Sequence, residues 1–197
     1  MSQFSISPLN SALIIWDMQY GIASRAFNLK EITDRINLLK DTAHGSGVPV
    51  LYSQQTKLPY QYMSKFQMLS LQKRGHDPKT SNYMAPNTHE WEIITELAPS
   101  TQDLVIQKHT PDFFIGTNLN QVLRARGIET PIITGVSTEV GIEATARHAA
   151  YLGYLPVVVE DAVGSADREM HEASLTIMRK MFELRSTNDI AQSLKKS

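Results

Sequence analysis

The sequence of 197 residues contains no cysteine. Disulfide bonds, thiolate ligands for metals and thiol nucleophiles are therefore all excluded, because each of them requires a cysteine sulfur. Any covalent catalysis would have to use another kind of side chain. This single absence narrows the chemistry open to the protein before any motif is considered.

The sequence also lacks a long apolar run and an excess of charge of one sign. It has no stretch of about 18 apolar residues, and Met1–Ile6 has neither the basic nor the apolar part of a signal peptide. The 19 basic and 20 acidic residues are interspersed and give a formal net charge of -1. We therefore expect a cytoplasmic protein that binds neither nucleic acid nor membranes.

A single domain over residues 1–197 is expected, because a chain of this length can bury one sizeable core. Apolar runs that suit buried strands alternate with segments of helical periodicity. The expected strands are 11–16, 48–52, 103–107, a run around 132–133, 154–159 and 182–184, and the expected helices are 29–43, 117–127, one after 137, one from 165 or 167 to 181, and one after 186. This alternation predicts an α/β fold, a three-layer α/β/α sandwich with a Rossmann-like, mostly parallel sheet of about six strands.

Residues 56–87 interrupt this alternation. They show no clear periodicity, and aromatic and methionine side chains are scattered among proline, lysine and asparagine. A segment of this length inside a compact domain is more often a functional insertion than a linker, so we assign it a substrate-covering role. A short helix is expected to follow, capped by Thr88 and with Trp91, Ile94 and Leu97 on one face.

Candidate functional groups follow three of the expected strands. Asp17 comes after the first strand, Lys108 after the third, and the turn from Ser137 to Gly141 after the fourth. Each has an ordinary explanation taken singly, since such residues also serve as caps, solvated charges and strand-to-helix turns. The carboxyl ends of parallel strands lie at one edge of a sheet, however, and their joint placement favours a functional site there.

The stretch 131–147 carries the most specific pattern, because a short apolar strand runs directly into a helix. Such a junction directs unpaired backbone N–H groups and the positive end of the helix dipole at one place. That arrangement suits an anion or an oxyanion. The alternative is an ordinary strand-to-helix turn of an α/β protein.

Three motifs in order resemble those of the isochorismatase-like hydrolases, the superfamily that includes isochorismatases, nicotinamidases and N-carbamoylsarcosine amidases. The motifs are Ile-Ile-Trp-Asp-Met-Gln at 14–19, Lys108 followed by Phe113 and Phe114, and Thr-Gly-Val-Ser-Thr-Glu-Val-Gly-Ile-Glu-Ala-Thr-Ala-Arg at 134–147. The resemblance extends over residues 11–185. It implies a hydrolase that acts on a small molecule and forms a homodimer or homotetramer.

The resemblance also implies roles for individual residues. Asp17 matches the catalytic acid or base of the family, and Lys108 matches the lysine that pairs with it. Val136 and Ser137 match two residues joined by a cis peptide bond, and the N–H groups of Ser137 and Gly141 would form an oxyanion hole. As a general acid, Asp17 needs a raised pKa, which burial favours and Lys108 opposes.

Two further residues are expected to contact the substrate. Gln55 matches a glutamine that touches substrate in the isochorismatases, with the adjacent Gln54 as the alternative if the register is shifted by one residue. Phe114 is expected to help close the pocket, together with the segment 56–87.

Gly141 is a departure from the amidases of the family, in which this position is the nucleophilic cysteine. A thioacyl-enzyme mechanism is therefore excluded for this chain. Ser137 and Thr138 carry hydroxyl groups nearby, but the resemblance assigns both to backbone and packing roles. Glycine at this position resembles the isochorismatases proper, in which an aspartate protonates a vinyl ether and water attacks the resulting cation.

Neither a metal nor a cofactor is expected. In the nicotinamidases, which this chain resembles, the segment after the second strand carries an Asp-x-His motif that binds a metal. Here residues 53–60 read Ser-Gln-Gln-Thr-Lys-Leu-Pro-Tyr instead, and the 6 histidines show no ligand spacing. Two interpretations of function stay open: a cofactor-free hydrolase of a small, anionic substrate, and a catalytically silent member that binds a ligand or serves as an assembly subunit. The acid and the amine at 17 and 108 favour the enzyme.

Overall fold

The structure is a computed structural model that describes residues 6–195. These residues form a six-stranded, wholly parallel sheet in the order β3-β2-β1-β4-β5-β6. The strands are β1 Ser11–Trp16, β2 Val50–Gln55, β3 Leu104–Lys108, β4 Thr130–Val136, β5 Val157–Gly164 and β6 Glu183–Arg185. The expectation about a signal peptide depends on residues 1–5, which lie outside the described range.

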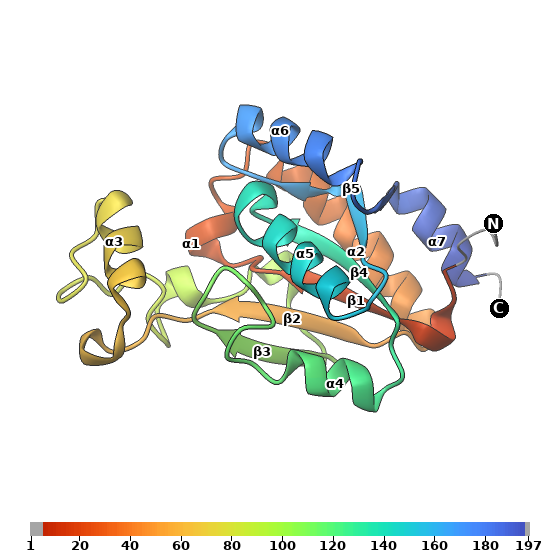
Figure 1. The fold of residues 1–197 in the computed structure, drawn as a ribbon, viewed down its shortest axis with the longest axis horizontal. Coiled ribbons are helices and arrows are strands. Elements are labelled where there is room, and N and C mark those ends of the chain that lie inside the picture. The colour runs from red at the N-terminus through yellow and green to blue at the C-terminus, as the bar shows by residue number, and fades with distance from the viewer. Residues whose placement is uncertain (1–5, 196–197) are drawn as a thin grey trace.

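Helices cover both faces of the sheet and give the three layers that the sequence predicted (Figure 1). They are α1 Tyr20–Ala23, α2 Leu29–Gly45, α3 Lys65–Lys73, α4 Leu119–Ala125, α5 Glu143–Tyr151, α6 Arg168–Met178 and α7 Thr187–Lys195. Side chains of α2 and α7 belong to one buried cluster, and side chains of α4, α5 and α6 belong to a second one. Within residues 6–195, no helix combines the length and the apolar character that a membrane span requires.

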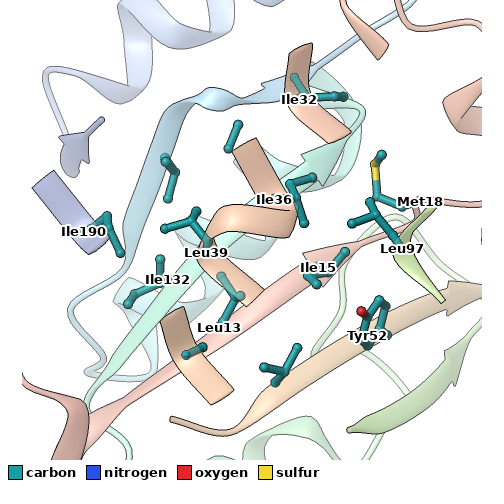
Figure 2. Close-up of a cluster of buried hydrophobic side chains, with 14 of the residues drawn as sticks. Leu13, Ile15, Met18, Ile32, Ile36, Leu39, Tyr52, Leu97, Ile132 and Ile190 are labelled. Atoms are coloured by element: carbon teal, nitrogen blue, oxygen red, sulfur yellow. The ribbon is translucent and has the colours of Figure 1, made fainter. Parts of the chain in front are cut away.

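Strand β1 lies in the middle of the molecule, and all of its side chains are buried. Leu13 and Ile15 point to one face, where they pack with Ile36 and Leu39 of α2 (Figure 2). Ala12, Ile14 and Trp16 belong to the opposite cluster. Because a buried aliphatic side chain contributes roughly 1.5–3 kcal/mol, this doubly covered strand anchors the sheet and holds its carboxyl end in place.

Helix α3 was not predicted from the sequence. Figure 1 shows it at one end of the molecule, away from the sheet, and only Leu71 among its residues is buried. A helix with so little buried surface leaves no apolar stripe of helical period in the sequence. It is capped instead by Ser64 and Gln67, whose side chains each accept a hydrogen bond from the backbone N–H of the other.

The prediction of a single helix after Thr88 is wrong. The chain forms two 3-10 turns there, His89–Trp91 and Thr95–Leu97. Between them the Ile94 N–H donates to the Met18 carbonyl at 2.9 Å, so the segment is tied to the residues that follow β1. Because the Ile94 N–H is used in this long-range hydrogen bond, it does not form the backbone hydrogen bond that would continue a helix.

Gly135 allows the ends of β4 and β1 to approach closely. It pairs in register with Trp16 and has a φ of +108°, a conformation that side chains disfavour. A Cβ atom at this position would lie 2.1 Å from the Trp16 carbonyl oxygen. Only glycine therefore fits between the two strands at the point where both turn into the candidate site.

We predict that Gly135→Ala lowers the free energy of unfolding by about 2 kcal/mol or more, because it adds a backbone clash to an unfavourable φ. Gly127→Ala is the matched control, since Gly127 also has a positive φ of +64° but nothing within 4 Å of an added Cβ. Its cost should be about 1 kcal/mol, from conformation alone. Urea unfolding followed by circular dichroism measures both, and equal losses would contradict the close-approach explanation.

Candidate active site

Asp17 and Lys108 meet at the carboxyl edge of the sheet. The Lys108 Nζ lies 2.7 Å from the Asp17 Oδ2, and the two side chains are 0% and 1% exposed, respectively. Strand β2 lies between β1 and β3 and supplies Ser53, whose Oγ donates to the Asp17 Oδ1 at 2.6 Å. The sequence placed both residues at strand ends, and the strand order brings them into contact.

The remaining hydrogen bonds of the pair are also satisfied. Lys108 Nζ donates to the Gln55 Oε1 at 2.9 Å and to the Thr110 carbonyl at 3.1 Å. The Asp17 N–H donates to the Ser53 Oγ at 3.0 Å, which holds Asp17 at a φ of 43° that is uncommon for a residue other than glycine. A backbone held in such a conformation fixes the direction of the carboxylate.

Burial shifts both pKa values of the pair. Desolvation raises the pKa of Asp17, although Lys108 and the Ser53 hydrogen bond oppose the shift. Desolvation likewise lowers the pKa of Lys108, and Asp17 opposes that change. The two pKa values thus move toward each other, so that moving a proton onto Asp17 costs less here than it would in water.

Trp16 occupies the volume that a side chain at position 141 would need. A Cβ built on Gly141 would lie 1.9 Å from both Cη2 and Cζ2 of the Trp16 ring. The ring is held by its Nε1–H, which donates to the Thr145 Oγ1 at 3.2 Å, and the Lys108 Nζ lies 3.9 Å from its centroid. The sequence identified glycine at this position, but only the structure gives the reason for it.

The oxyanion hole expected at Ser137 and Gly141 is not open at Gly141. The peptide bond between Val136 and Ser137 is cis, as the resemblance implied. The Gly141 N–H, however, donates to the Ser137 carbonyl at 3.0 Å, and Gly141 does not line the cavity described below. The reason is that a π-helical turn, Thr138–Ile142, begins directly after the strand and uses this N–H.

The hydroxyl of Thr138 is also occupied. Its Oγ1 donates to the Gly164 carbonyl at 3.0 Å and lies 2.8 Å from the His171 Nδ1. These bonds join the turn to the end of β5 and to α6. Thr138 therefore has a packing role, as the resemblance implied, and its hydroxyl is not available as a nucleophile.

A cavity of about 290 Å³ opens beside Asp17 and Trp16. Gln55, Ser137 and Glu139 line it from the sheet edge and the turn. Most of the opposite wall comes from the segment 56–87, through Thr56, Lys57, Leu58, Met63, Phe66, Gln67, Ser70, Leu71, Arg74, Tyr83 and Met84. The segment that lacked periodicity thus lies over the candidate site.

The two expected substrate contacts have different outcomes. Gln55 lines the cavity, whereas Gln54 turns away and donates from its Nε2 to the Trp91 carbonyl at 3.2 Å. Phe114 is 7% exposed, does not line the cavity and packs in the core, where its ring centroid is 6.0 Å from that of Tyr154. The expectation for Phe114 is therefore wrong, because the chain after β3 turns this ring inward beneath α5.

Four charged residues of the cavity wall were not named as site residues in the sequence analysis. Arg25 follows α1, Lys57 lies shortly after β2, Arg74 follows α3, and Glu139 lies in the π-helical turn. Glu139 belongs to the motif at 134–147, but its position in the motif did not indicate which way its carboxylate points. The two arginines come from segments without a motif, so their convergence on one cavity is visible only in the structure.

Comparisons with known proteins show the family to which the chain belongs. A family model described as "Isochorismatase domain" matches residues 11–189. A ureidoacrylate amidohydrolase RutB from Acinetobacter baylyi is 30% identical over 196 residues, which cover 90% of this chain and 80% of that protein. An uncharacterized isochorismatase family protein, YecD, from Escherichia coli is 31% identical over 188 residues, covering 93% and 96% of the two chains.

Solved structures share the fold. A cysteine hydrolase from Pseudomonas syringae superposes with a TM-score of 0.86 at 24% identity and covers 99% of each chain. An N-carbamoylsarcosine amidase from Thermoplasma acidophilum superposes with a TM-score of 0.72 at 25% identity, covering 91% of this chain and 97% of the other. The described residues of the present chain contain neither a cysteine nor a group of three or more side chains able to hold a metal.

We predict that Gly141→Ala and Trp16→Leu are strongly coupled, because the added methyl group and the indole compete for one volume. Gly141→Ala alone should lower the free energy of unfolding by about 1–3 kcal/mol. The double variant should lose less than the sum of the single losses by about 1 kcal/mol or more. Urea unfolding of the four proteins measures this coupling.

Gly45→Ala is the control, since an added Cβ at Gly45 has nothing within 4 Å. Its effect should be small and additive with that of Trp16→Leu. Additive losses for Gly141→Ala and Trp16→Leu would contradict the contact between their side chains.

Proposed function

This chain belongs to the isochorismatase family of hydrolases, and from that premise we propose that it hydrolyses a vinyl ether in a small, anionic, isochorismate-like substrate. Asp17 acts as the general acid and water as the nucleophile. The observation that carries the proposal is the volume above Gly141, which the Trp16 ring fills beside the buried Asp17 and Lys108. A site of this shape keeps the acid of the family but has no room for a nucleophilic side chain at position 141.

The reaction proceeds without an acyl-enzyme. Protonated Asp17 transfers its proton to the terminal carbon of the vinyl group, and the adjacent ether carbon becomes an oxocarbenium ion. Water then adds to that carbon, and the resulting hemiketal breaks down to a ketone and an alcohol. The raised pKa of Asp17 favours the protonated form that this sequence of steps requires.

Amide hydrolysis is the activity that the names of several relatives carry. In this chain a cysteine-dependent version of it is excluded, because the sequence contains no cysteine. The second candidate is a catalytically silent protein that binds a ligand or serves as an assembly subunit. The buried Asp17–Lys108 pair favours the enzyme, since burying an acid and an amine costs several kcal/mol per ion and a scaffold has no need for it.

The charges of the cavity wall favour an anionic substrate. Arg25, Lys57 and Arg74 line the cavity, against two carboxylates. Among residues 6–195, no ion pair includes Arg25 or Arg74. Guanidinium groups bind carboxylates through paired hydrogen bonds, so we propose that these two arginines hold the substrate carboxylates.

We predict that Asp17→Asn lowers kcat by at least about 10²-fold while substrate binding persists, because the amide cannot donate the proton. Isochorismate, nicotinamide and simple amides are offered as substrates, and pyruvate and ammonia are measured. Pyruvate release by the native protein, falling as the pH rises through the raised pKa of Asp17, supports the proposal. Ammonia release, or an Asp17→Asn variant with more than about a tenth of the native rate, contradicts it.

We predict that Arg74→Gln and Arg25→Gln each raise KM about tenfold or more with a smaller effect on kcat, since charge-assisted hydrogen bonds contribute roughly 1.5–3 kcal/mol. Lys73→Gln is the matched control, because Lys73 is the exposed neighbour of Arg74 and does not line the cavity. Steady-state kinetics of pyruvate release at low salt compares the three variants. A KM for Lys73→Gln that rises as much as that of Arg74→Gln would contradict a specific contact.

A further inference from the structure

Glu139 is the second carboxylate that lines the cavity, besides Asp17. Its Oε1 accepts a hydrogen bond of 2.8 Å from the Oγ of Ser165, which is itself 1% exposed. The Ser165 Oγ in turn accepts from the Asp167 N–H at 3.1 Å, at the start of α6. One oxygen of Glu139 is therefore held firmly by a neutral partner.

The other oxygen of Glu139 has no partner. Its Oε2 is buried and accepts no hydrogen bond within residues 6–195, and no ion pair there includes Glu139. Buried acceptors in folded proteins are nearly always satisfied, so an unpaired oxygen in a residue of the cavity wall indicates that a ligand or water supplies the missing donor. Neither Asp17 nor the residues that form hydrogen bonds with it donate a hydrogen bond to this oxygen.

Glu143, one turn further along the chain, shows what a structural carboxylate looks like in the same region. Its Oε1 lies 2.6 Å from the Arg147 Nη2, and its Oε2 accepts from the Ser174 Oγ at 2.5 Å. Both of its oxygens are occupied, and it does not line the cavity. The contrast with Glu139 is between a carboxylate whose two oxygens are both bonded within the fold and a carboxylate of the cavity wall with one oxygen unpaired.

The proposed reaction forms a cation, and a negative charge in the cavity would stabilise it. Proton transfer from Asp17 creates an oxocarbenium ion, and a preorganised anion in a cavity shielded from water stabilises such a cation. Glycoside hydrolases, which pass through an oxocarbenium-like transition state, divide the work in the same way between an acid and a second carboxylate. Asp17 is paired with Lys108, whereas the Glu139 carboxylate accepts a hydrogen bond only from the Ser165 hydroxyl within residues 6–195.

We propose that Glu139 is a second catalytic carboxylate, which stabilises the oxocarbenium ion and accepts a proton from the attacking water. This inference rests on the proposed function. When the water oxygen bonds to the cationic carbon, one of its protons passes to Glu139. As the hemiketal breaks its bond to the leaving oxygen, Glu139 gives that proton to this oxygen, and the remaining hydroxyl proton returns to Asp17.

The test is Glu139→Gln, which keeps the size of the side chain and removes its charge. Because the proposed substrate is anionic, removing a negative charge from the cavity should strengthen its binding while it slows the chemistry. We predict that kcat falls about 10²-fold and that KM falls as well, in steady-state assays of pyruvate release from isochorismate. A merely structural role would leave KM unchanged or raise it.

Two further variants separate the effect of the Glu139 charge on catalysis from effects on folding. Glu143→Gln is the matched control and should lower the melting temperature without lowering KM. Ser165→Ala removes the hydrogen bond to Glu139 but keeps the carboxylate, so it should retain more than about a tenth of the native kcat. A thermal melt of each variant by circular dichroism verifies that it is folded.

The outcomes distinguish this inference from the proposed function. If the native protein releases pyruvate and Glu139→Gln retains more than about a third of its kcat, the role of Glu139 is overturned and the proposed function stands. Equal losses in Ser165→Ala and Glu139→Gln would also overturn it, since the anchor and not the charge would then matter. A native protein that releases no pyruvate overturns the proposed function and this inference together.

Discussion

The contact between Asp17 and Lys108 is the interaction on which the candidate site depends. It joins the ends of β1 and β3 across β2, with 2.7 Å between the Lys108 Nζ and the Asp17 Oδ2 and almost no exposed surface on either side chain. Removing two such charges from water costs several kcal/mol per ion. The cost is offset only because Ser53, Gln55 and Thr110 satisfy the remaining donors and acceptors. Any change that displaces one of these strands therefore also removes a partner from a buried charge.

The contact between Trp16 and Gly141 gives this acid and amine their particular chemical surroundings. The indole fills the space above the glycine, contacts the Lys108 ammonium through its face and is fixed by Thr145. A side chain at position 141 would therefore require the indole of Trp16 to move. The absence of a nucleophile at this position is thus a property of two residues that touch, and it is the basis for the proposed use of proton transfer and water.

The cavity wall is contributed by parts of the chain that differ greatly in how they are held. Asp17 and Gln55 stand on a rigid parallel sheet, and Glu139 is tied to Ser165 at the end of β5. Arg74 instead follows α3, a helix with a single buried residue. The proposed reacting groups thus stand on the scaffold, and the proposed substrate-holding Arg74 follows a helix with little buried surface. This division is expected where a ligand must enter and leave a cavity.

From the amino-acid sequence alone one could predict most of the sheet and its helices, the absence of thiol chemistry, and the placement of Asp17 and Lys108 at strand ends on one edge of the sheet. This was possible because burial on both faces of a strand, or on one stripe of a helix, leaves a periodic apolar pattern among adjacent residues. The sequence analysis missed α3, which buries too little surface to leave such a pattern, and it misplaced Phe114 in the site. The cover of Trp16 over Gly141 and the unpaired oxygen of Glu139 are visible only in the folded molecule. Those features depend on side-chain contacts between residues far apart in the chain, and local patterning carries no record of them.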